Sequence, residues 1–168
     1  MITTTNRVDA ADLTRMRHAM VSSQLRTTAV SDNRVVTAMT TVPREAYLPE
    51  AVRQIAYRDT LIPLGSGRYQ NIPMATGRLL TQAELIREDR VLLIGATGGY
   101  TAAVLAAMGM QVVAVEEEPE LVALARRAGP TGLAPVLRVD TTGAFDVAGT
   151  AAWLEAALAG APPRQAAE

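Results

Sequence analysis

The sequence predicts an α/β fold in which a helical N-terminal region precedes a parallel β-sheet. From Arg90 onward, short apolar segments alternate with segments of helical character. The apolar segments are hydrophobic at nearly every position, which is typical of parallel strands covered on both faces. Before that point, apolar residues recur mainly at helical spacing. With 168 residues, 49% of them hydrophobic, the chain has the size and apolar content of one domain.

Composition excludes several classes of function. Sixteen basic and seventeen acidic side chains nearly cancel, so no overall charge favours nucleic acid or an anionic membrane surface. Cysteine is absent and His18 is the only histidine, which argues against a disulfide, a zinc site or a Ser-His-Asp triad. No apolar run reaches the roughly 18 to 20 residues of a membrane span. We therefore expect a cytoplasmic protein with no metal, no nucleic-acid partner and no membrane anchor.

Two helices are expected first. Residues 9 to 27 predict the first, because apolar residues recur there at helical spacing: Leu13, Met16, Met20 and Leu25. Ser31 or Asp32 can cap the second, since both side chains accept hydrogen bonds from free backbone amides at a helix start.

A less regular segment follows. Pro43 and Pro49 bracket a short turn, and the weak alternation of residues 55 to 64 indicates an extended piece. Residues 65 to 73 are rich in turn-forming residues and predict a loop that leads into a helix over residues 74 to 85.

The second half predicts a βαβαβ unit. Its strands are expected at residues 90–95, 111–116 and 134–140, and its helices at residues 100–108 and 119–128. We divide the single domain, residues 1–168, into a helical and loop region at 1–88, this unit at 89–150, and a helix with a tail at 151–168.

Gly95, Gly98 and Gly99 lie at the first turn of this unit and indicate a ligand. A Walker loop needs Lys followed by Ser or Thr, which is absent here, and the spacing matches the dinucleotide pattern G-x-G-x-x-G poorly. Glu116, however, ends the next strand, where doubly wound sheets hold an acid against ribose hydroxyls. S-adenosylmethionine has a ribose and no phosphate, so it suits this pattern. A plain strand-helix turn and a nicotinamide site remain alternatives.

Several blocks in order resemble the protein-L-isoaspartate O-methyltransferase family: MVSSQL, VPREAYLP, AYRDTLIPLGSGR, DRVLLIGATGGYTAAVLA and VVAVEEEPEL. The resemblance implies a Rossmann-like parallel-sheet methyltransferase fold that uses S-adenosylmethionine to methylate the α-carboxylate of L-isoaspartyl residues in damaged proteins. The methyl ester then collapses to a succinimide, so the reaction serves protein repair.

The resemblance also implies site residues. It places Gly95, Thr97, Gly98, Gly99, Glu116 and Asp140 around the cofactor, Asn71 at the catalytic position, and Ile72 and Pro73 beside the isoaspartyl protein or peptide. A peptide carboxylate has an ordinary pKa of about 3.5 to 4, so at neutral pH it needs no general base. The scarcity of His and Cys therefore does not conflict with this chemistry.

Four residues depart from the family pattern. Asn71 and Ile72 replace the Ser and Gln of the family's Gln-Thr-Ile-Ser-Gln-Pro loop, and isoleucine cannot form the hydrogen bond of a glutamine. Leu93 replaces an acid, and Thr97 replaces a glycine at a position where positive φ would strain a β-branched residue. A divergent or inactive family member that binds S-adenosylmethionine without methylating isoaspartate is the alternative.

The sequence also predicts a C-terminally shortened sheet. Twenty-eight residues follow Asp140, whereas one βαβ unit takes roughly 30 or more. Either the chain is a truncated member, or another chain supplies the missing sheet edge in a homo-oligomer, since an exposed edge otherwise invites aggregation.

Overall fold

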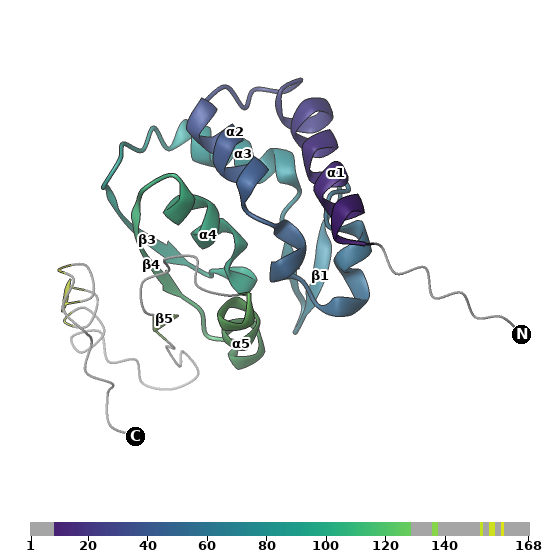
Figure 1. The fold of residues 1–168 in the computed structure, drawn as a ribbon. Helices are drawn as coiled ribbons and strands as arrows, with labels where there is room; N and C mark the ends of the chain where they lie inside the picture. Colours follow the sequence, from purple (N-terminus) through teal and green to yellow (C-terminus); the bar gives the residue numbers. More distant parts are fainter. Residues whose placement is uncertain (1–8, 129–135, 138–151, 153–154, 157–158, 160–168) are drawn as a thin grey trace, which may run out of the picture.

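The computed structural model describes residues 9–128, 136–137, 152, 155–156 and 159, and its described part has the α/β organisation that the sequence predicts (Figure 1). A two-stranded antiparallel hairpin lies beside a three-stranded parallel sheet. The α-helices are α1 (Ala10–Met20), α2 (Asn33–Thr41), α3 (Pro73–Gln82), α4 (Tyr100–Ala107) and α5 (Pro119–Arg127). The strands are β1 (Ile62–Gly65), β2 (Arg68–Gln70), β3 (Arg90–Ile94), β4 (Gln111–Val115) and β5 (Val136–Leu137).

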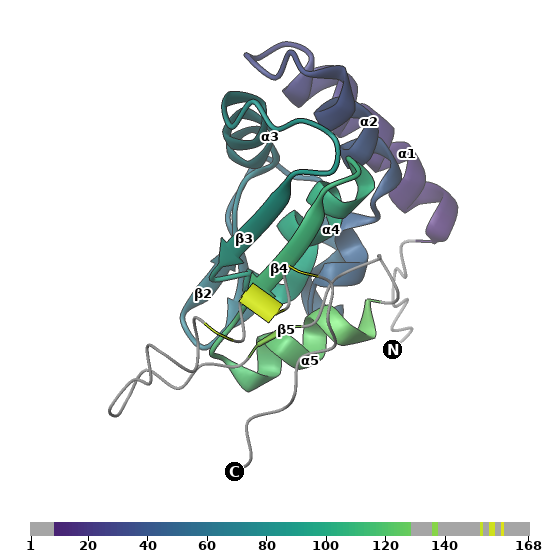
Figure 2. The same cartoon turned by 90° about the vertical axis from the view of Figure 1, so that its left-hand side faces the viewer.

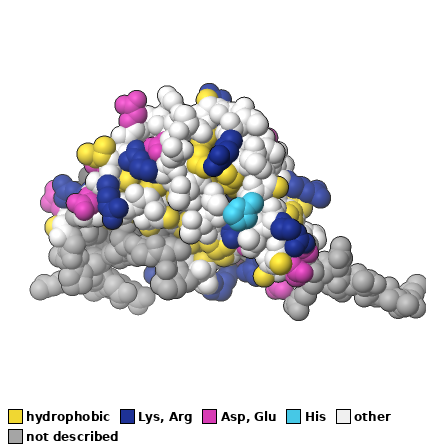
Figure 3. Space-filling view, turned by 45° about the horizontal axis from the view of Figure 1, so that its top comes forward, with side chains coloured by type: hydrophobic (Ala, Val, Ile, Leu, Met, Phe, Trp, Pro, Cys, Tyr) yellow, Lys and Arg dark blue, Asp and Glu magenta, His cyan; other side chains and the backbone are white. Residues whose placement is uncertain are grey.

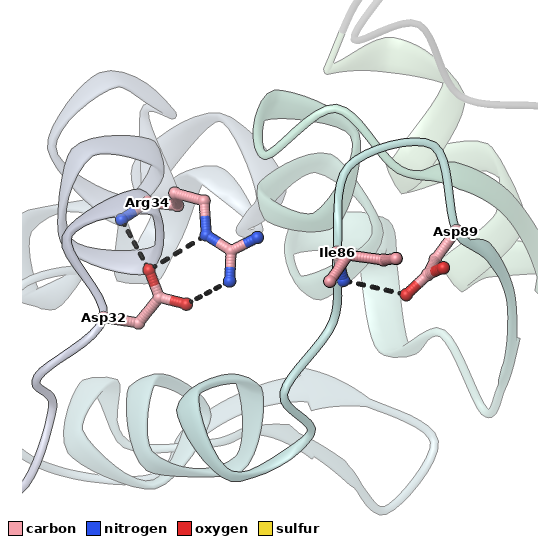
Figure 4. A network of polar contacts seen from close by, with 4 residues as sticks. All are labelled: Asp32, Arg34, Ile86 and Asp89. Carbon is pink, nitrogen blue, oxygen red and sulfur yellow. Dashed lines mark hydrogen bonds and ion pairs between the residues drawn. The ribbon is translucent and has the colours of Figure 1, made fainter.

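Side-chain caps fix the starts of the first two helices. The Asp9 carboxylate accepts a hydrogen bond from the Asp12 amide at 2.6 Å, and α1 continues into a π-helical turn, η1 (Val21–Leu25). For α2, Asp32 rather than Ser31 is the cap, because its Oδ1 accepts from the Arg34 amide at 2.8 Å (Figure 4). The first predicted helix is therefore confirmed, with a π-helical turn at its end. The second is also confirmed, and Asp32 is its cap.

The segment before the hairpin is more helical than expected. The predicted turn between the two prolines forms a 3-10 helix, η2 (Arg44–Tyr47), and a second one follows, η3 (Glu50–Ile55). The predicted extended piece over residues 55–64 is therefore wrong before Ile62, where β1 begins.

The predicted loop over residues 65–73 is also wrong in part, because β2 lies inside it. β1 and β2 pair with Ile62 opposite Gln70, and a two-residue turn at Ser66 and Gly67 joins them. Both turn residues have positive φ, +50° at Ser66 and +68° at Gly67, which is the backbone that tight hairpin turns require. The glycine-rich stretch is thus a hairpin turn rather than an open loop.

The parallel sheet has the order β3-β4-β5. Both crossovers move in the same direction, so the right-handed rule puts α4 and α5 on one face of the sheet. In Figure 2 the strands β3 and β4 lie in front of α4. The prediction that all strands are covered on both faces is wrong for β3, because Leu92 is 40% and Ile94 75% exposed on the opposite face. The central strand β4 is nevertheless buried at Val112, Val113 and Ala114.

One hydrophobic core joins the helical region to the sheet. It runs from Met20 and Leu25 near the end of α1, through Met39 of α2, to Leu105 of α4 and Leu121 of α5. Next to β3, the Ile86 amide donates to the Asp89 carboxylate at 2.8 Å and closes the turn that starts the strand (Figure 4).

The surface of the described part carries the single histidine. His18 is exposed on α1 and is visible at the surface in Figure 3. Within the residues described, no helix combines the length and the apolar character that a bilayer crossing needs.

Candidate cofactor and substrate site

The turn between β3 and α4 is held in left-handed backbone conformation. The φ angles are +70° at Gly95, +44° at Thr97, +77° at Gly98 and +93° at Gly99. Thr97 is the one residue of these four that carries a side chain, and such a conformation costs about 1 to 3 kcal/mol. The positive φ expected at Thr97 is therefore confirmed.

The three glycines of the turn differ in what surrounds them. A Cβ on Gly99 would meet the Ala125 Cβ at 2.7 Å, and one on Gly98 would meet Leu124 at 3.1 Å. A Cβ on Gly95 would find no atom within 4 Å. Gly98 and Gly99 thus let α5 pack against the turn, whereas Gly95 borders open space in which a ligand could approach the backbone.

Glu116 joins the ends of two parallel strands. Its Oε2 accepts a hydrogen bond from the Thr97 amide at 2.7 Å, and its Oε1 accepts from the Glu118 amide at 3.1 Å. The residue is only 4% exposed. Each carboxylate oxygen has a second lone pair, so the anchored group can still accept from a ligand hydroxyl. It lies at the carboxyl edge of the sheet, where open α/β sheets bind their ligands.

The hairpin brings the predicted substrate segment to the same turn. β2 lies against the Thr97–Gly99 turn, and the Leu64 side chain is 3.5 Å from where a Gly98 Cβ would be. An exposed ion pair between Arg68 of β2 and Glu117, next to Glu116, links the two segments. Residues far apart in sequence therefore form one region.

The predicted substrate residues begin α3. Asn71 is exposed directly after β2, while its backbone oxygen accepts a hydrogen bond from Arg44. Ile72 is half-buried at the N-cap, and Pro73 is buried as the first residue of the helix. Of these three, Asn71 is thus the side chain most accessible to a substrate. Their roles remain predictions.

Two buried polar residues near Asn71 were not predicted as site residues. The Arg44 side chain is fully buried, and its Nε donates to the Ala56 oxygen at 2.7 Å. Gln70 is 4% exposed, and among the described residues neither polar atom of its amide has a hydrogen-bond partner. The burial of both side chains depends on tertiary neighbours, so helical or strand periodicity gives no sign of it.

Two buried tyrosines among the described residues have strongly shifted pKa values. Burial raises the pKa of Tyr100 to about 12, against the opposing effect of the Arg44 guanidinium. Burial and a hydrogen bond to Glu45 also raise the pKa of Tyr57. Both phenols are therefore protonated at neutral pH and neither is suited to act as a base.

The remaining predictions concern Asp140 and the absence of a metal site. Asp140, predicted at the adenine end of the cofactor, lies outside the described residues. Within the described ranges, no three acidic or histidine side chains gather as a metal site would require.

Known proteins similar to this chain share one description. The family model for protein-L-isoaspartate(D-aspartate) O-methyltransferase matches residues 15–140. Protein-L-isoaspartate O-methyltransferase 2 of Marinobacter nauticus is 39% identical over 154 residues, which cover 89% of this chain and 66% of that protein. The enzyme of Methanoculleus marisnigri is 36% identical over 140 residues, covering 81% of this chain and 64% of that protein. The chain thus spans just under two thirds of the length of these relatives.

Solved structures show the same fold. A protein-L-isoaspartate O-methyltransferase superposes with a TM-score of 0.62 at 24% identity, covering 73% of this chain and 41% of the other. A Plasmodium falciparum structure described as this type of methyltransferase, in complex with S-adenosyl-L-homocysteine, gives 0.65 at 18% identity, covering 80% and 68%. The family match covers most of the chain, and the fold agrees with it. The chain therefore belongs to the protein-L-isoaspartate(D-aspartate) O-methyltransferase family.

Proposed function

We propose that the protein binds S-adenosylmethionine at the turn after β3 and transfers its methyl group to the α-carboxylate of L-isoaspartyl residues in proteins or peptides. One observation carries the proposal: the anchored Glu116 carboxylate and the open space at Gly95 lie at the carboxyl edge of the sheet, and the strand β2 that precedes the exposed Asn71 packs against the glycine turn of that edge. Relatives that cover most of the chain carry the corresponding enzyme name.

The residues at the turn fit this cofactor. Gly95 leaves room for the backbone to approach a ligand, and Glu116 offers oxygen acceptors of the kind that ribose hydroxyls require. The carboxylate oxygens suit a ligand that presents hydroxyl and ammonium donors rather than phosphates. Gly98, Gly99 and Thr97 would support the cofactor indirectly, by holding the turn against α5 and Glu116.

The reaction asks the protein mainly for orientation. The cofactor supplies an activated methyl group when it is bound. The substrate carboxylate is already ionised at neutral pH, so no side chain has to remove a proton. Holding the reacting atoms in line can contribute about 7 to 11 kcal/mol. Asn71 would donate a hydrogen bond from its amide to the substrate, and Ile72 and Pro73 would fix the start of α3 beside it.

The proposal extends to organisation and location. We treat residues 1–168 as one domain, supported by the core that runs without a break from α1 to α5. We place the activity in the cytoplasm, where the sequence leads us to expect the protein.

A labelling assay tests the proposed activity. The full chain is incubated with S-adenosylmethionine carrying a labelled methyl group and a peptide that contains one L-isoaspartyl residue. The same peptide with normal aspartate is the substrate control, and Glu116→Gln is the protein control. We expect label only in the isoaspartyl peptide, as an ester that base releases. Equal labelling of both peptides, or none by the wild-type chain, would sink the proposal, and binding without transfer would favour the divergent member.

A further inference from the structure

The buried guanidinium of Arg44 contacts three separate parts of the chain. Its Nε donates to the backbone oxygen of Ala56, at 2.7 Å, and its Nη2 donates to the backbone oxygen of Asn71. The same group lies over the ring of Tyr100, 5.0 Å from the ring centre. Ala56 follows η3, Asn71 follows β2, and Tyr100 is the first residue of α4, directly after the glycine turn.

This arginine is buried without an acidic partner. None of the ion pairs among the described residues includes Arg44, although Arg17 forms one with the neighbouring Glu45. Burying a charge is costly unless other groups solvate it. Two carbonyl dipoles and the face of an aromatic ring stabilise the charge here, while Nη1 has no hydrogen-bond partner among the described residues. The arrangement is therefore specific to a side chain that can reach all three contacts at once.

The contacts connect the two halves of the proposed site. Asn71 is the proposed substrate residue, while Tyr100 belongs to the helix that begins at the proposed cofactor turn. We propose that Arg44 is a positioning residue that holds the Asn71 segment at a fixed place relative to the glycine turn. The inference rests on the proposed function, since it assigns the purpose of that spacing to methyl transfer.

An arginine suits this task better than a lysine. Its guanidinium is planar, so two of its nitrogens can donate to separate carbonyls while its face stacks on a ring. A lysine keeps the charge, but its single ammonium cannot make the planar stack and both directed bonds together. Arg44→Lys therefore removes the bridge and keeps the charge.

Arg53→Lys provides a control for the exchange of arginine for lysine. Arg53 lies in η3 and its Nε also donates to a backbone oxygen, that of Leu48, at 3.2 Å. Among the described contacts it reaches neither Asn71 nor Tyr100. Both variants thus exchange an arginine that holds a carbonyl. Arg53 is exposed and Arg44 is buried, so this control covers the loss of a guanidinium–carbonyl bond, and the KM measurement below covers the effect of burial.

The first measurement is hydrogen exchange of backbone amides in the full chain. Arg44→Lys should speed exchange of the amides of residues 68–72 by about tenfold, because the anchor of that segment is lost. Arg53→Lys should leave that segment unchanged. If Arg44→Lys does not fold, Tyr100→Leu takes its place, since it removes the ring beneath the guanidinium. Unchanged exchange at residues 68–72 in the folded variant overturns the inference.

The second measurement separates positioning from general loss of stability. In Arg44→Lys we expect the KM for an isoaspartyl peptide to rise by about tenfold and kcat/KM to fall by about 100-fold. The affinity for S-adenosylhomocysteine should stay at the wild-type value. A merely structural role would lower the folded fraction, and hence kcat, at an unchanged KM; that result would overturn the inference.

The two proposals fail in different ways. If the wild-type chain methylates no isoaspartyl peptide, the proposed function fails, while the amide exchange of residues 68–72 still decides whether Arg44 holds that segment. If the wild type is active and Arg44→Lys behaves like Arg53→Lys in both measurements, only the inference about Arg44 fails.

Discussion

Thr97 adopts a left-handed backbone conformation that a threonine does not favour. Its φ of +44° is unfavourable for a β-branched side chain, yet two hydrogen bonds hold it there. The amide donates to Glu116 at 2.7 Å, and the hydroxyl donates to the Gly95 oxygen at 2.6 Å. The turn is thus kept in shape by its contacts rather than by the intrinsic preference of the residue.

Replacing Thr97 separates the two effects. Both Thr97→Gly and Thr97→Ala lose the hydroxyl bond, but only Thr97→Gly removes the backbone strain, so the difference between the two variants reports the strain alone. We expect the glycine variant to have a free energy of unfolding about 1 to 2 kcal/mol above that of the alanine variant. Urea denaturation of the two purified variants measures the difference. An alanine variant as stable as the glycine variant would show that the backbone at residue 97 is not strained.

The glycines of the turn should respond differently to the addition of one methyl group. Gly99→Ala would drive a Cβ into Ala125, so we expect it to lower the free energy of unfolding by about 2 to 4 kcal/mol. Gly95→Ala meets no neighbour and should cost about 1 kcal/mol. Its effect should instead be on binding, with S-adenosylhomocysteine bound about tenfold more weakly.

Urea denaturation and calorimetric titration of the same two variants test whether Gly99→Ala mainly lowers stability and Gly95→Ala mainly lowers affinity. The assignment of Gly95 to a ligand surface is wrong if its alanine variant binds as tightly as the wild type. The packing role of Gly99 is wrong if its alanine variant is as stable as that of Gly95.

Among the elements, α2 carries a cap whose effect depends on pH. The Arg34 side chain, which donates to Asp32, lowers the pKa of that carboxyl from its ordinary value of 3.8. A group whose pKa is lower in the folded state stabilises the fold above its unfolded pKa. That stabilisation is lost as the pH falls through the folded value, so the relevant window lies below 3.8.

Removing the cap should therefore matter most at neutral pH. Asp32→Ala should lower the free energy of unfolding by about 1 kcal/mol at pH 7. The difference in free energy of unfolding between Asp32→Ala and the wild type should narrow below pH 3.8, where the wild-type carboxyl becomes protonated. Asp32→Asn, which keeps a cap acceptor without the charge, is the control. A gap that stays constant through acid titration would contradict the charged role of Asp32.

The elements differ in how well the sequence predicts them. α1, α2 and α5 have regular apolar spacing or caps, α4 is an alanine-rich run after the glycine turn, and β4 is a continuous apolar run, so local patterns suffice for them. β1 and β2 have four and three residues, too few for a clear alternation, and they depend on the turn at Ser66 and Gly67. Their pairing is a tertiary contact, which explains why the segment reads as a loop.

The candidate site was predictable to a similar degree. The glycine turn and Glu116 follow from a strand, a turn and an acid in fixed order, and the structure brings them together. Asn71 depended on the family resemblance. Arg44 is a charged residue in a largely apolar block, and its three contacts lie 12 to 56 positions away along the chain, so no local pattern could assign them.

At the scale of the whole molecule, the sheet has unequal faces. The handedness of the two crossovers puts α4 and α5 on one side, and Leu92 and Ile94 of β3 are exposed on the other. The proposed site lies at the carboxyl edge of this sheet, next to the hairpin. Glycine turn, acid and substrate segment thus depend on packing between the N-terminal helices, the hairpin and the sheet.

The central claim is that this assembled edge binds the cofactor, and calorimetric titration with S-adenosylhomocysteine tests it most directly. Glu116→Gln removes the anchored acid, while Glu120→Gln changes an exposed acid in the first turn of α5 and serves as the control. We predict that the wild type and Glu120→Gln bind alike and that Glu116→Gln binds at least about tenfold more weakly. No binding by the folded wild type, or equal binding by Glu116→Gln, would contradict the account.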